Sequence, residues 1–133
     1  MIRIPREIHD GMIAHAKGGF PLEVCGILGG TDGTVSAMYR MTNTDASNEH
    51  FMMDPKEQFS VVKALRAKGI SMLSIYHSHP ETPARPSEED IKLALTPDVS
   101  YIIISLADPE KADMKSFKIS NGNVIAEEIV VSA

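Results

Sequence analysis

The part of the 133-residue chain best suited to chemistry is Tyr76-His77-Ser78-His79-Pro80. The apolar run from Met72 onward predicts a β-strand that ends at His79. Side chains two positions apart on a strand point to the same face, so His77 and His79 project together. Two imidazoles on one face can chelate a divalent ion, with Zn–N distances of about 2.0–2.1 Å. An isolated pair is more often two hydrogen-bonded histidines at a strand end, so the pair alone is a weak signal.

A carboxylate follows the histidines at a position that can complete the ligand set. Ser87 is a good N-cap for a short helix, and Asp90 can close a capping box with it, which is an ordinary role for both residues. Helical spacing also places Asp90 on the same stripe as the apolar residues Ile91 and Ala94. A carboxylate that faces inward needs a partner, and a metal ion is a strong one. Two His and one carboxylate leave a zinc position open for water, which is the catalytic pattern.

A metal-bound water needs a general base beside it, and Glu23 is the candidate. Zinc lowers the pKa of its bound water from about 15.7 to about 7. The segment from Leu22 to Leu28 predicts a buried strand in which Glu23 is the lone charge. The alternative is a strand-end carboxylate that points at water, and the local sequence leaves both interpretations open. Cys25 would share a face with Glu23 on a regular strand, but most buried lone cysteines act as small hydrophobic residues.

Together these residues resemble the JAMM (MPN-plus) signature of zinc metallopeptidases. That signature is an upstream Glu, then His-x-His, ten intervening residues and an Asp, with a Ser three residues before the Asp. Glu23, His77-Ser78-His79-Pro80 and Pro86-Ser87-Glu88-Glu89-Asp90 match it at the expected spacing. The motifs span residues 23–90, and the order of the flanking elements resembles a bare JAMM core of the small stand-alone prokaryotic type.

The resemblance implies a site and a reaction. His77, His79 and Asp90 would ligate one Zn²⁺ per chain. Glu23 would activate the bound water, and Ser87 would donate a hydrogen bond to the oxyanion. JAMM enzymes hydrolyse amide or isopeptide bonds after the C-terminal glycines of ubiquitin and its relatives. For a small member the implied partner is the Gly-Gly tail of a ubiquitin-like or sulfur-carrier protein, joined to an amino acid or peptide.

Two other functions remain open. One is a non-catalytic MPN scaffold for protein assembly, although such scaffolds usually lack part of the ligand set that this chain retains. The other is a RadC-like, DNA-repair-associated protein with a similar H-x-H-P and S-x-x-D arrangement. Those relatives usually carry an additional DNA-binding segment, and none is apparent here. Bound zinc together with hydrolysis that depends on Glu23 would separate the enzyme from the scaffold.

Composition argues against several broad classes. The chain is 43% hydrophobic and 23% charged, which is close to globular averages and unlike disordered or fibrous proteins. A formal net charge of -5 and scattered basic residues argue against a nucleic-acid partner. We see neither a leader sequence nor an apolar run long enough to span a bilayer, so we expect no membrane partner and a cytoplasmic location. The sequence does not fix the oligomeric state, and a homodimer stays open.

The elements that must position these residues predict one domain over residues 1–133. The expected fold is α/β (α+β), with a mixed, curved central sheet flanked by helices; the resemblance makes it a JAMM/MPN, cytidine deaminase-like core. Strands are expected at residues 2–4, 22–28, 34–41, 51–53, 72–79, 99–106, 114–119 and 124–131, the last two joined at Asn121-Gly122. Helices are expected over about residues 6–17 and 55–68 and from Ser87 onward, with Phe59, Val62 and Leu65 of the second facing inward.

Overall fold

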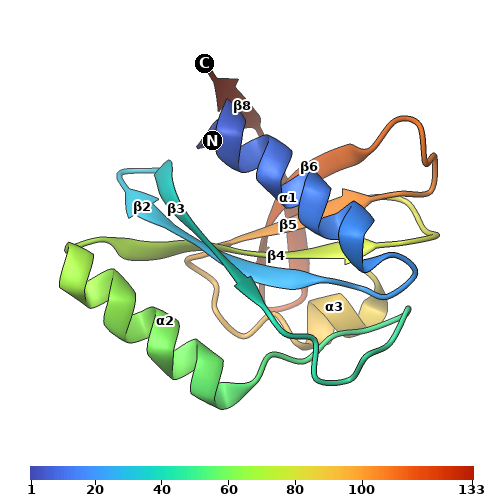
Figure 1. The fold of residues 1–133 in the computed structure, drawn as a ribbon, viewed down its shortest axis with the longest axis horizontal. Coiled ribbons are helices and arrows are strands. Elements are labelled where there is room, and N and C mark those ends of the chain that lie inside the picture. Colours follow the sequence, from blue (N-terminus) through green and yellow to red (C-terminus); the bar gives the residue numbers. More distant parts are fainter.

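A mixed sheet of eight strands forms the frame of the protein, and the computed structural model describes all residues from 1 to 133 (Figure 1). The strands are β1 (Ile2–Pro5), β2 (Cys25–Thr31), β3 (Thr34–Met41), β4 (Ser71–His79), β5 (Ser100–Ser105), β6 (Asp113–Ser120), β7 (Asn123–Glu127) and β8 (Ile129–Ser132). The helices are α1 (Arg6–Gly19), α2 (Pro55–Lys68) and α3 (Glu88–Lys92). The strand order is β7-β6-β5-β4-β2-β3-β1-β8.

The sheet curls until its two ends approach each other. β7 and β8 stand at opposite ends of the strand order, yet only Glu128 separates them along the chain. The N–H of Ile2 donates to the carbonyl of Glu128 at 3.0 Å. The carboxylate of Glu127 accepts hydrogen bonds from Ser100 at 2.6 Å and Ser116 at 2.7 Å, which ties β7 to β5 and β6. The predicted mixed fold with a curved sheet is thereby confirmed.

The two faces of the sheet carry separate cores, and the histidine pair lies on one of them. α1 covers the first face, where Met12 packs in a cluster that includes Tyr76. α2 covers the other face, where Leu65 packs in a cluster with Cys25. Cys25 pairs with His77 across β2 and β4, so His77 points to the α2 side while Tyr76 points to the α1 side. The side chains of Tyr76 and His77, which are neighbours on β4, therefore lie on opposite faces of the sheet.

The central strands that carry the pair are buried and closely packed. All six residues of β5, which falls within the strand expected at residues 99–106, are buried. Gly26 pairs with Tyr76, and a side chain on Gly26 would collide with the Tyr76 ring. The Tyr76 hydroxyl in turn bonds to Nδ1 of His15 on α1 at 2.7 Å. β2 is therefore held tightly against β4 beside His77.

α2 has the predicted bounds, but its predicted inner face is only partly confirmed. Asp54 caps it by accepting from the N–H of Lys56 at 2.8 Å, and Gly69 ends it in the left-handed conformation at φ 67°. Phe59 was expected to face inward, and this is wrong, because 64% of its surface is exposed. Leu65 is buried as predicted, Val62 is half-buried, and Val61 is buried beside Leu65. The apolar residues of this helix fit two stripes equally well by spacing, and only the packed sheet selects one.

Three predicted strands differ from the structure. β2 begins at Cys25, not Leu22, because the preceding N–H groups bond elsewhere: that of Leu22 to Gly19 at 2.9 Å and that of Glu23 to Ser47 at 2.8 Å. Residues 51–53 make only an isolated bridge, between Asn43 and Met53. Residues 124–131 form two strands, β7 in the predicted hairpin and β8 parallel to β1. None of the helices has both the length and the apolar composition needed to cross a bilayer.

Candidate metal centre

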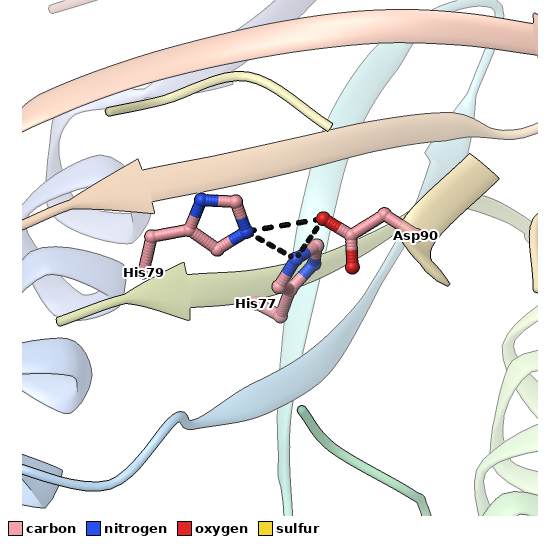
Figure 2. A group of neighbouring side chains, drawn as sticks. All are labelled: His77, His79 and Asp90. Atoms are coloured by element: carbon pink, nitrogen blue, oxygen red, sulfur yellow. Dashed lines mark hydrogen bonds and ion pairs between the residues drawn. The ribbon is translucent and has the colours of Figure 1, made fainter. Parts of the chain in front are cut away.

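His77, His79 and Asp90 converge where β4 ends (Figure 2). Nε2 of His77 lies 3.1 Å from Nε2 of His79. Oδ2 of Asp90, from α3, lies 3.2 Å from Nε2 of His77 and 3.1 Å from Nε2 of His79. Ligands of a tetrahedral zinc with bonds of about 2.0–2.1 Å lie about 3.3 Å apart, so the spacing of these atoms suits one ion. No other trio of His, Cys, Asp or Glu side chains is close enough to share an ion.

The facing atoms of His79 and Asp90 need a positive charge between them. Nδ1 of His79 lies 2.9 Å from the carbonyl of Pro83, which can only accept, so Nδ1 carries the proton. The lone pair of His79 Nε2 therefore faces the carboxylate of Asp90, which also only accepts when ionised. A proton or a metal cation must lie between them. A hydrogen bond from the second ring nitrogen of this kind is typical of metal-binding histidines.

The surroundings keep Asp90 ionised. Burial acts to raise the pKa of Asp90, but hydrogen bonds from His77 and His79 outweigh it and hold this pKa well below its usual range. Burial acts to lower the pKa of His79, but its hydrogen bonds to Asp90 and to the carbonyl of Pro83 outweigh burial and raise it. Asp90 thus stays ionised, as a ligand of a cation must, whereas a metal ion has to displace the proton that the raised pKa of His79 favours on this ring.

The helix cap fixes the orientation of Asp90. The N–H of Ser87 donates to Oδ2 of Asp90 at 2.9 Å, and the N–H of Asp90 donates to Oγ of Ser87 at 3.1 Å. This is the predicted capping box, and it is confirmed. Oγ of Ser87 is an acceptor in that bond, so its own proton stays available to a substrate oxygen. The capping role and the site role of both residues are therefore compatible.

Glu23 is buried beside the trio. Only 4% of its surface is exposed, and its Oε1 atom has no hydrogen-bond partner. Burial raises the pKa of Glu23 to about 7, although the nearby His79 acts to lower it. Together with His79 and Ser87 it lines a polar pocket of about 250 Å³. The alternative of a carboxylate that points into open water does not hold. Glu23 lies just before β2, not on it as predicted.

An apolar pocket adjoins the other side of the trio. It is lined by His77 and Asp90 together with Phe51, Leu93 and Tyr101, among others. The ring of Phe51 stacks on that of His77 with a centroid distance of 4.7 Å and an angle of 28°. Nδ1 of His77 is buried and has no hydrogen-bond partner. The converging atoms thus lie between a polar pocket and an apolar one.

Asn43, which the sequence did not single out, holds this arrangement together. Its side-chain amide donates to the carbonyl of Glu23 at 3.1 Å and to that of His50 at 3.0 Å. Its side-chain oxygen accepts from the N–H of Met52 at 3.1 Å. The N–H of Glu23 also donates to the carbonyl of Ser47. The loop between β3 and α2 therefore binds both the N–H and the carbonyl of Glu23. The sequence signals a turn residue here, but not its distant partner.

Cys25 behaves as a small hydrophobic residue. It is fully buried, and burial raises the pKa of its thiol to about 12. The neutral thiol is a poor nucleophile and a poor metal ligand. His9 and His50 bond to Asp10 at 2.9 Å and to Asp45 at 3.0 Å. All three residues lie outside the converging trio.

Comparison with known proteins assigns the family. The family described as prokaryotic homologs of the JAB domain matches residues 5–120. The CysO-cysteine peptidase of Mycobacterium tuberculosis is 35% identical over 130 residues, which are 96% of this chain and 89% of that protein. A desampylase of Haloferax volcanii is 32% identical over 111 residues, which are 78% of this chain and 80% of that protein. The chain therefore belongs to the prokaryotic JAB-domain family, and it is a small JAMM-type hydrolase, as the sequence motif implied.

Solved structures agree with this assignment. The solution structure of protein DSY2949 from Desulfitobacterium hafniense has a TM-score of 0.91 at 48% identity and covers 99% of this chain and 93% of that chain. A JAB1/MPN domain protein from Archaeoglobus fulgidus has a TM-score of 0.65 at 22% identity and covers 97% of each chain. The second likeness shows the fold alone, and that fold is the predicted JAMM/MPN core.

We expect Asn43→Ala to lower the free energy of unfolding by about 1–3 kcal/mol, because the partly buried carbonyls of Glu23 and His50 lose their donor. Urea unfolding of the purified protein measures this. Asn48→Ala is the matched control, since Asn48 lies in the same loop, is exposed and forms no side-chain hydrogen bond. Equal midpoints for the two variants would refute the bracing role of Asn43.

Proposed function

We propose that this hydrolase is a zinc-dependent peptidase that cleaves the amide bond after the C-terminal Gly-Gly of a ubiquitin-like or sulfur-carrier protein adduct. The observation that carries the proposal is the convergence of His77, His79 and Asp90 beside the buried, unpartnered carboxylate of Glu23. Relatives named for cleaving a CysO-cysteine adduct and for desampylation support the substrate class. The complete ligand set favours an enzyme over a non-catalytic scaffold.

The residues of the chain divide the work of amide hydrolysis. The zinc ion, held by His77, His79 and Asp90, would supply Lewis acidity and a water of lowered pKa. The carboxylate of Glu23, which no hydrogen bond within the protein engages, would accept the proton of the attacking water and pass it to the leaving amine. The hydroxyl of Ser87 is free to donate to the carbonyl oxygen as negative charge develops there.

We predict about one zinc ion per chain, lost in His77→Ala and in Asp90→Ala because two ligands cannot hold the ion tightly. Elemental analysis after dialysis against metal-free buffer measures the ratio. His9→Ala, which removes a histidine outside the trio, should keep the full zinc content. Zinc retained by both ligand variants would rule out this ligand set.

Glu23→Gln should keep the zinc and lose hydrolysis by about 10²–10⁴-fold, because an amide cannot accept the proton. The assay follows release of the group joined to the Gly-Gly end of a carrier adduct by mass spectrometry. Glu110→Gln removes an exposed carboxylate elsewhere and serves as the control. Full activity in Glu23→Gln would show that Glu23 is not the base.

Ser87→Ala should slow turnover by about 10²–10³-fold and leave the zinc content intact, because an oxyanion donor is lost. The lost helix cap costs about 1 kcal/mol in stability, which thermal unfolding measures separately. Ser87→Thr keeps both a hydroxyl and a good N-cap, so it should recover much of the rate. If alanine and threonine were equally active, the hydroxyl would have no role in turnover.

A further inference from the structure

The polar pocket beside the trio carries several acidic side chains. Seven residues from four separate segments line it: Glu23, Asn48, Glu49, His79, Glu81, Thr82 and Ser87. Three of them are glutamates, and none is Lys or Arg. Glu49 and Glu81 are exposed, and neither forms a salt bridge, so nothing in contact neutralises their charges. A group that enters this pocket meets two carboxylates that have no ion-pair partner, close to His79 and the metal position.

Glu23 indicates which part of a substrate lies there. Glu23 is buried, with only 4% of its surface exposed, its Oε1 has no hydrogen-bond partner, and the residue lines this pocket. Under the proposed function, Glu23 passes a proton to the leaving amine, which requires the amine to come within about 2.6–3.2 Å of the carboxylate. The leaving group must therefore lie in the pocket that Glu49 and Glu81 flank.

We propose that Glu49 and Glu81 make this pocket selective for leaving groups that carry cationic residues near the scissile bond, such as a basic peptide joined through a lysine side chain, and against free amino acids. A free amino acid joined through its α-amine carries a carboxylate two bonds from the scissile nitrogen, next to both glutamates. A lysine joined through its ε-amine presents methylene groups there. This inference rests on the proposed function and extends it to the leaving group.

The expected selectivity is moderate because both glutamates are exposed. A single exposed charge contact changes an equilibrium by up to about fivefold. Two such contacts, attractive for one leaving group and repulsive for the other, give a difference of about tenfold. The difference should shrink at high salt, since exposed charges are screened within about 3 Å at 1 M ionic strength.

The test uses zinc-loaded protein and one tail peptide ending in Gly-Gly, joined to the lysine of an arginine-flanked peptide or of an aspartate-flanked peptide. A second pair joins the same tail to the α-amine of free alanine or of alanine amide. We expect kcat/KM about tenfold higher for the basic peptide than for the acidic one at low salt, and a severalfold preference for the amide over free alanine. Both preferences should fall below about threefold in the double variant Glu49→Gln/Glu81→Gln.

The matched control removes the same charge elsewhere. Glu7→Gln/Glu110→Gln takes two exposed carboxylates from outside the pocket and should keep both preferences. Equal kcat/KM within each pair, or preferences that persist in Glu49→Gln/Glu81→Gln, would overturn the selectivity while leaving the proposed hydrolysis intact. Failure to hydrolyse any of the four substrates would overturn the proposed function, and the selectivity with it.

Discussion

Three electron-rich atoms that point at one another are the constraint on which the site depends. The two imidazole nitrogens and the Asp90 oxygen lie 3.1–3.2 Å apart. Because Pro83 fixes the proton of His79 on the far side of its ring, these atoms repel unless a cation lies among them. Protons supply that charge in the absence of a metal, and a divalent ion supplies it more fully. The local structure is therefore favourable only when positive charge is present.

The fold holds this arrangement in place before any ion or substrate arrives. β4 lies in the middle of the sheet, flanked by β2 and β5, so the histidines stand on a rigid strand. The capping box fixes Asp90, and the loop braced by Asn43 fixes the backbone of Glu23. The buried, unpartnered Glu23 carboxylate costs stability, and most of its charged neighbours are carboxylates that add to that cost. Such a compromise between stability and reactivity is expected at a catalytic site.

The sequence predicts features that depend on neighbouring residues, but not contacts between residues that are far apart in the chain. The strand alternation of His77 and His79 and the cap formed by Ser87 and Asp90 depend on neighbouring residues, and both are confirmed. Asn43 was missed because its partner lies 20 residues away. The break between β7 and β8 was missed because an apolar run does not show that its halves pair with opposite ends of a curved sheet. Glu23 was placed on a strand, although its N–H bonds to a loop instead.

The most direct test of the shared ion is a crystal structure of the zinc-loaded protein with anomalous data collected at the zinc absorption edge. One strong peak is expected at about 2.0–2.2 Å from Nε2 of His77, Nε2 of His79 and a carboxylate oxygen of Asp90, with solvent in the remaining position. A zinc peak bound to other residues, or none at this position, would contradict the metal centre and the hydrolytic role built on it.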